Sequence, residues 1–241
     1  MNGVSPAGRD FVDGRRLLLA IGTSILAAAA VGMASFFLLH VLFGTAGGST
    51  IAQVVTLLVY LTLLIGLCAQ FRPVPAPPIA LRPTGIRHAL MSVAIWVATV
   101  AAIILFYYCF GSVFGSVPDV AKRLTGFATD ARRLQGQPTA DWILAILRGC
   151  LIVPIFEEVF FRGLFLSWLR KHLTKEIAVI VMASVFTLEH GSFIVGPYVF
   201  IFAIVTGYVR LRTHSTFNTV IMHILNNVML LYVGLRIFSG P

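Results

Sequence analysis

Two adjacent carboxylates, Glu157 and Glu158, stand inside an apolar stretch of this chain of 241 residues. A charged side chain at membrane depth costs at least about 2.5 kcal/mol to insert, so a pair of them indicates a functional site. Arg162 follows Glu158 by one helical turn and lies on the same helix face, whereas Glu157 points about 100° away. We therefore expect Glu158 and Arg162 to neutralise each other, and Glu157 to need a partner from another helix.

Two imidazoles and one amide are candidate partners for Glu157. His190 ends a later apolar segment and shares a helix face with Phe186, while His223 and Asn227 share a face within the last segment. At a rise of 1.5 Å per residue, the distance of these side chains from the ends of their helices places them at about the same depth in the membrane as Glu157. We expect one carboxylate, two imidazoles and one amide to converge.

The composition indicates that the membrane positions these residues. Hydrophobic residues make up 58% of the chain and charged residues 11%, which is too few charges to cover a soluble surface. The net charge of +9 does not indicate nucleic-acid binding, because the basic residues lie between apolar segments without a continuous basic stripe. The predicted fold class is all-α, a multi-pass transmembrane helical bundle with about seven to eight membrane segments.

Seven apolar segments are visible, at residues 17–43, 51–70, 88–115, 142–169, 177–190, 198–209 and 215–238. The fifth and sixth are short for full spans, and short spans inside a bundle often border a cavity. The proline-rich stretch 72–83 excludes a helix and predicts a boundary. We expect residues 1–86 to form N-terminal membrane helices and this linker, and residues 87–241 to form a catalytic helical core.

The positions of lysine and arginine predict the orientation. Basic groups before the first segment and after the second, fourth and sixth fall on one side if every segment crosses once. This predicts an integral protein of the cell membrane with a cytoplasmic N-terminus. The mixed-charge segment 117–141 counts against the rule, and we interpret it as an interfacial helix.

Three stretches resemble the motifs of the CPBP family (CAAX protease and bacteriocin-processing, also called Abi) of intramembrane proteases, which includes Rce1-type CAAX endopeptidases. They are Glu157-Glu158-Val159-Phe160-Phe161-Arg162 for E-E-x-x-x-R, Phe186-x-x-x-His190 for the second motif and His223-x-x-x-Asn227 for the third. The order and relative spacing agree with the family, and the resemblance covers roughly Trp142 to Tyr232.

The resemblance implies a role for each matched residue. Glu157 would be the general base that activates water for attack on a peptide carbonyl, with His190 beside it. His223 and Asn227 would donate hydrogen bonds to the oxyanion. The implied substrate is a membrane-associated peptide or protein, for which CAAX-type C-terminal processing is one candidate.

Glu158 and Arg162 would support the site without taking part in the reaction. We expect no cofactor, but zinc is an open alternative, because Glu157, His190 and His223 would provide three ligands and leave one position open. The expected partners are membrane lipids and the substrate, without nucleic acid, and the sequence predicts no oligomeric state.

Readings of other classes stay open. The chain could be a non-enzymatic bacteriocin-immunity or partner-binding membrane protein, a function linked to relatives in the family. It could also be a small transporter that uses the buried carboxylate as a proton site. In a purely structural reading, His223 and Asn227 would be interhelical hydrogen-bonding residues, and Asn226 could replace Asn227 as a donor.

Overall fold

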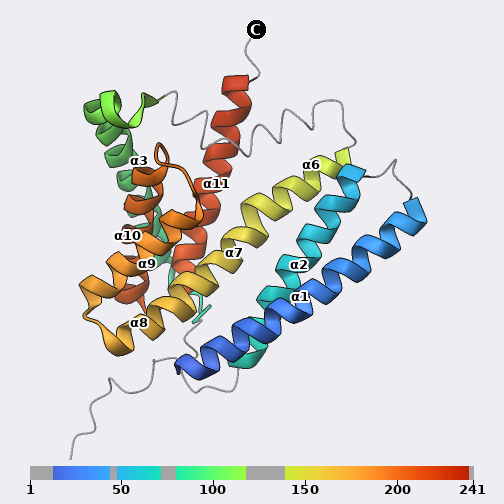
Figure 1. Cartoon of the computed structure of the whole chain (residues 1–241). Coiled ribbons are helices and arrows are strands. Elements are labelled where there is room, and N and C mark those ends of the chain that lie inside the picture. The colour runs from blue at the N-terminus through green and yellow to red at the C-terminus, as the bar shows by residue number, and fades with distance from the viewer. Residues whose placement is uncertain (1–12, 44–47, 72–79, 118–138, 239–241) are drawn as a thin grey trace, which may run out of the picture.

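The computed structural model describes residues 13–43, 48–71, 80–117 and 139–238, and every regular element within them is a helix (Figure 1). The elements are α1 (Gly14–Phe43), α2 (Gly48–Phe71), α3 (Ile86–Phe114), α6 (Thr139–Ile146), η3 (Leu147–Ile152), α7 (Val153–Glu157), η4 (Glu158–Phe165), α8 (Leu166–His172), α9 (Lys175–Glu189), α10 (Gly196–Thr213) and α11 (Thr216–Phe238). The all-α prediction is confirmed for this part of the chain. The predicted interfacial helix at 117–141 lies almost entirely outside the described residues.

Four of the described helices are long and apolar enough to cross a membrane. They are α1, α3 and the segments Thr50–Phe71 of α2 and Thr216–Arg236 of α11. These helices fit a membrane protein, but the predicted seven to eight membrane segments are not confirmed. The fourth predicted segment is divided among shorter helical elements, α9 has only 15 residues, and α10 carries two arginines in its last turn.

Residues 139–172 form a helical rod in which α6, η3, α7, η4 and α8 follow one another without a break (Figure 1). The segments η3 and η4 are π-helices. At the end of η3, the N–H of Val153 donates to the carbonyl of Arg148, which is five residues earlier. Pro154 accounts for the wider turn of η3, because proline has no N–H and its ring crowds the carbonyl four residues earlier. A wider turn relieves that conflict. Single π-turns inside α-helices frequently mark functional sites.

A buried cluster holds the rod against α9, α10 and α3. It includes Tyr107, Phe161, Met182, Phe186 and Ala203. In Figure 1, α9 and α10 lie beside the C-terminal half of the rod. This packing brings the first motif, on the rod, against the second, on α9, where the Phe161 and Phe186 rings are 4.9 Å apart between centroids.

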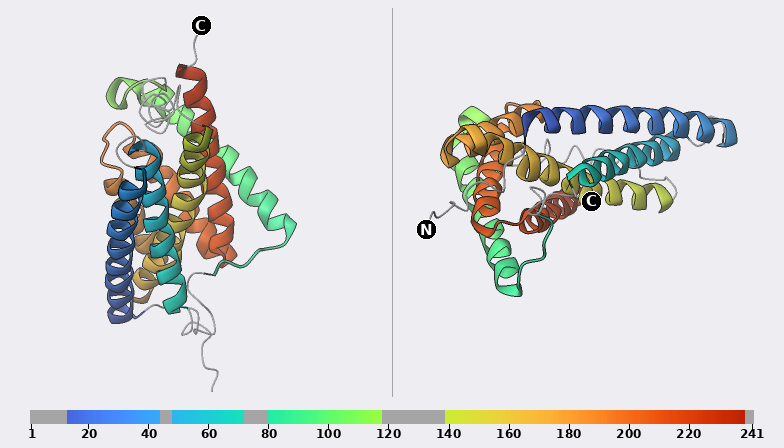
Figure 2. Two further views of the ribbon diagram at one scale, coloured as in Figure 1. Left: turned by 90° about the vertical axis from the view of Figure 1, so that its right-hand side faces the viewer. Right: turned by 90° about the horizontal axis from the view of Figure 1, so that it is seen from below.

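The N-terminal helices pack on the rod as well. A second cluster joins Leu17 and Ala20 of α1 and Leu67 of α2 to Val159 and Leu164 of η4. Figure 2 shows α1 and α2 side by side along one flank of the molecule. Most of the remaining surface of α1 is exposed apolar side chains, as expected of a helix that faces lipid.

The described end of the proline-rich stretch is attached to the start of α11. The N–H of Thr216 donates to the carbonyl of Ala80 at 3.0 Å, and the Ser215 hydroxyl donates to the carbonyl of Arg82 at 2.7 Å. Residues 72–79 lie outside the described residues. Residues 80–83, the described part of the stretch 72–83, are not helical, as predicted.

Candidate active site

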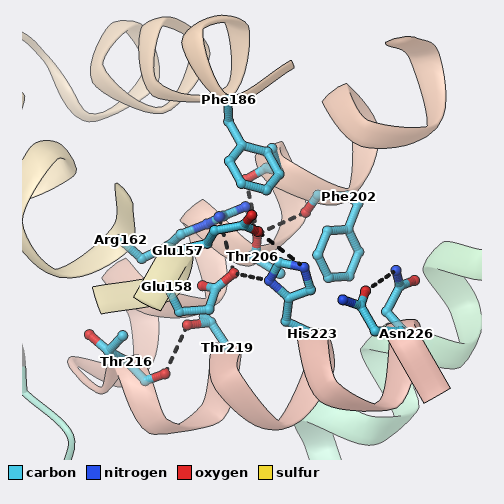
Figure 3. Close-up of polar contacts among 12 residues, drawn as sticks. Glu157, Glu158, Arg162, Phe186, Phe202, Thr206, Thr216, Thr219, His223 and Asn226 are labelled. Carbon is cyan, nitrogen blue, oxygen red and sulfur yellow. Dashed lines mark hydrogen bonds and ion pairs between the residues drawn. The ribbon is translucent and has the colours of Figure 1, made fainter. Parts of the chain in front are cut away.

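The ion pair predicted within the rod is present and fully buried. Glu158 Oε1 lies 3.0 Å from Arg162 Nη1, and neither side chain is exposed. Arg162 Nη2 also donates to the Thr206 hydroxyl at 2.8 Å, and the guanidinium lies 4.3 Å from the centroid of the Phe186 ring. The sequence prediction of this pair is confirmed, and α9 and α10 add further contacts to it (Figure 3).

His223 of α11 lies between the two adjacent carboxylates. Its Nδ1 is 2.9 Å from Glu158 Oε1, and its Nε2 is 3.6 Å from Glu157 Oε2. Because Glu158 is paired with Arg162, its carboxylate accepts, and Nδ1 of His223 carries the hydrogen that is donated. The Nε2 atom is therefore directed toward Glu157 (Figure 3). Glu157 thus has a partner on another helix, as the sequence analysis expected.

The charges of this buried cluster favour one additional proton. Two carboxylates and one guanidinium carry a net charge of −1, and a net charge buried away from water is costly. One proton on Glu157 or on Nε2 of His223 makes the cluster neutral. At 3.6 Å the two groups are within ion-pair distance and longer than a hydrogen bond, so a proton passes between them only after they approach or through a bridging water.

Glu157 and His223 line a cavity of about 370 Å³ together with His190 and Asn227. All four side chains with predicted catalytic roles therefore border one space, although they come from α7, α9 and α11. Glu158 is completely buried behind His223 and does not border it. The cavity lies within the lower range of volumes that bind small ligands in proteins.

His190 can contact a ligand in the cavity through only one of its two ring nitrogens, because the other is bonded to the backbone. It caps the C-terminus of α9, where Nδ1 lies 2.8 Å from the carbonyl of Phe186 and the two rings are 4.7 Å apart. A hydrogen bond to a carbonyl requires the hydrogen on Nδ1. Nε2 is then the atom through which His190 can bind a water or a substrate.

The Asn227 amide is already engaged with the backbone of the rod. Its Nδ2 donates to the carbonyl of Gly149 at 2.8 Å. An amide nitrogen has two hydrogens, so a second one can serve a substrate oxygen. Asn226 is oriented differently, because its Oδ1 accepts from the hydroxyl of Tyr198.

The sequence analysis missed several residues at the cavity and around it. Thr56 and Tyr60 of α2 and Arg148 of η3 border the cavity, and Thr206 of α10 binds Arg162. Arg148 carried a signal, since it is a charged residue within an apolar segment. For Thr56 and Tyr60 no local pattern distinguishes them from lipid-facing residues of the same helix.

The residues of the alternative zinc set do not form a compact ligand cluster. Among the described residues, no group of three or more His, Cys, Asp or Glu side chains is close enough together to hold a metal ion.

Comparison with known proteins supplies one match. Residues 139–229 match the family described as type II CAAX prenyl endopeptidase Rce1-like. The matched segment contains all six residues that the three motifs predicted, and α1, α2 and α3 precede it. No curated protein and no solved structure matches the chain.

Proposed function

We propose that this chain is an intramembrane endopeptidase with a glutamate-activated water, because residues 139–229 match the family of Rce1-like endopeptidases. Its substrates are membrane-associated peptides or proteins, and CAAX-type C-terminal processing is one candidate reaction. One observation carries the proposal. Glu157 borders the cavity, 3.6 Å from Nε2 of a histidine whose Nδ1 is held by a second, buried carboxylate.

In the first step, Glu157 accepts a proton from a water in the cavity. The oxygen of that water forms a bond to the carbonyl carbon of the substrate, and the carbonyl π-electrons move to oxygen. His190 contributes a second acceptor through Nε2 and can hold the water in line. A carboxylate shielded from bulk water is a stronger base than an exposed one.

Stabilisation of the oxyanion then falls to His223 and Asn227. His223 can donate through Nε2 only as imidazolium, and Glu158 stabilises that form because it accepts from Nδ1. The second hydrogen of the Asn227 amide is a further donor. Glu158 thereby has the orienting role that the buried carboxylate has in a catalytic triad, and it is a positioning residue.

In the last step, the peptide C–N bond breaks and the oxyanion returns to a carbonyl. The leaving nitrogen takes up a proton from Glu157 or His223, and the products are an amine and a carboxylic acid. One proton is moved from water to the leaving group, so the cluster returns to its initial state. No metal or organic cofactor is required for this sequence, and zinc held by Glu157, His190 and His223 is the alternative that experiment must test.

The proposal includes a topology. The chain is a multi-pass protein of the cell membrane with a cytoplasmic N-terminus, residues 87–241 form the catalytic core, and residues 1–86 form an accessory pair of helices with its linker. The basic groups at the ends of the apolar segments support this orientation. Membrane lipids and the substrate are the expected partners.

The test compares purified wild type with Glu157→Gln on a library of membrane peptides. Glu176→Gln is the matched control, because Glu176 is an exposed carboxylate beside Lys175 at the start of α9. We expect wild type and the control to cleave and Glu157→Gln to be inactive. Equal cleavage by all three proteins would refute the proposal, and immunity or partner binding that persists in Glu157→Gln would favour the non-enzymatic alternative.

A further inference from the structure

The carbonyl of Gly149 in the rod has no donor within its own helix at the two usual positions. Four residues later, the N–H of Val153 donates to the carbonyl of Arg148 instead, and five residues later Pro154 has no N–H. Asn227 supplies a donor, because its Nδ2 lies 2.8 Å from the Gly149 oxygen. This bond fixes which end of the Asn227 amide is the nitrogen, so the Oδ1 end is left to accept from another group.

Asn226 carries a second amide at the cavity, next to His223 (Figure 3). Its Nδ2 lies 3.5 Å from Oδ1 of Asn227, and its Oδ1 accepts from the hydroxyl of Tyr198. The reversed orientation would set the oxygens of the two amides against each other, so the nitrogen of Asn226 faces Asn227. Tyr198 is held in turn, because its N–H donates to the hydroxyl of Tyr107 at 3.2 Å. Both ends of the Asn226 amide therefore have a fixed direction.

The Asn226 nitrogen has donor capacity left for a ligand. An amide nitrogen has two hydrogens, and within the described part of the chain the polar contact of this nitrogen is the one with Asn227. At 3.5 Å that contact is at the outer limit for a hydrogen bond. Asn226 borders the cavity although only 4% of its surface is exposed. The cavity is thus the space from which a ligand reaches this donor.

We propose that Asn226 is a second amide donor to the oxyanion, and that Tyr198 is the positioning residue that keeps its nitrogen available. This inference rests on the proposed peptidase function and deepens it, because it adds a catalytic residue outside the three sequence motifs. Asn226 and Asn227 follow His223 by three and four residues on α11, so both lie on its side of the helix, one turn further on. Three donors then converge on one oxygen in a space shielded from bulk water, where such donors act most strongly.

The donor role is tested by steady-state kinetics of the full-length protein in detergent, on a peptide that wild type cleaves. Asn226→Leu replaces the amide by a branched apolar side chain of similar shape. We expect kcat to fall roughly 100-fold with KM within about threefold of wild type, as for the loss of an oxyanion donor. Tyr198→Phe keeps the amide but removes the group that orients it, so kcat should fall roughly tenfold. Tyr208→Phe, an exposed tyrosine on the same helix, is the control and should keep its kcat.

The double variant Asn226→Leu with Tyr198→Phe separates catalysis from stability. Removing both partners of a buried hydrogen bond costs less than removing one, so the double variant should unfold at a higher temperature than Asn226→Leu. Its kcat should nevertheless equal that of Asn226→Leu, because Tyr198 acts through Asn226. A double variant that regains kcat together with stability would overturn the inference.

The orientation of Asn226 can be measured without catalysis. The asparagines of the chain are Asn2, Asn218, Asn226 and Asn227. Isotope labelling of their side-chain nitrogens gives one magnetic resonance signal pair for each, assigned by its loss when that asparagine is replaced. Tyr198→Phe should shift the Asn226 signals and leave those of Asn218 unchanged, and unshifted Asn226 signals would refute the positioning role.

The outcomes for the inference and for the proposed function differ. A wild type that cleaves no peptide would refute the peptidase function and the donor role with it. A wild type that cleaves, together with Asn226→Leu at a kcat within about threefold of it, would refute the donor role alone. An active Glu157→Gln would refute the glutamate mechanism alone.

Discussion

His223 Nδ1 lies 2.9 Å from Glu158 Oε1, so the second carboxylate of the adjacent pair orients the imidazole that faces the first. Glu158 is itself fixed by Arg162 at 3.0 Å. The resulting order from the cavity inward is Glu157, His223, Glu158, Arg162. Each member contacts the next. The first three predictions below follow from the contacts of this series, and the fourth concerns the packing of α1 against α2.

Glu158→Gln should lower kcat by roughly 100-fold or more with little change in KM, because an amide does not stabilise the His223 imidazolium as a carboxylate does. Steady-state kinetics with a cleaved peptide checks this. The exposed Glu176→Gln is the control for the change from carboxylate to amide. A kcat within threefold of wild type would contradict the positioning role.

Arg162→Met should lower the free energy of unfolding by about 3–5 kcal/mol, since it leaves the Glu158 charge buried without its cation. The double variant Glu158→Leu with Arg162→Met removes both charges and should be more stable than Arg162→Met alone. Thermal unfolding in detergent measures both. A double variant that is less stable than the single one would show that the loss does not come from the unpaired charge of Glu158.

Thr206→Val should cost about 1.5–3 kcal/mol, because the Thr206 hydroxyl accepts from the buried guanidinium of Arg162 at 2.8 Å. Thr99→Val is the matched control. The Thr99 hydroxyl is also buried in a helix, and its bond goes to the carbonyl of Ile95 in its own helix. Equal losses in the two variants would mean that the contact with Arg162 adds nothing.

Gly66→Ala should weaken the contact between α1 and α2. A Cβ at Gly66 would lie 2.7 Å from Ser24 Oγ and 3.2 Å from Ser24 Cβ, so the helices would have to separate. Gly22→Ala is the control in α1, since a Cβ there meets nothing within 4 Å. We expect a lower unfolding temperature for Gly66→Ala and an unchanged or slightly higher one for Gly22→Ala. An unchanged value for both would indicate that α1 shifts freely against α2.

Activity should survive exhaustive chelation, because the proposed route moves the proton through Glu157 and His223 without a metal. Peptide cleavage is measured before and after chelation, together with metal analysis of the purified protein. Loss of activity that added zinc restores would support the alternative in which Glu157, His190 and His223 are ligands.

The sequence by itself determined where the last helix lies and which side chains share a face within one helix. The segment predicted at 215–238 is α11, Thr216–Phe238, because a run of apolar residues is a local property of the chain. The pair Glu158 and Arg162 was predictable for the same reason, since one helical turn fixes their common face.

The tertiary structure alone decided how these groups are arranged. Which nitrogen of His223 faces Glu157 depends on how α11 crosses the rod, and the contributions of Thr206 and Tyr60 depend on helices far away in the sequence. The π-turns before and after Glu157 change the direction of every side chain that follows. Periodicity specifies a face within one helix, but only packing between helices determines which faces meet and at what distance.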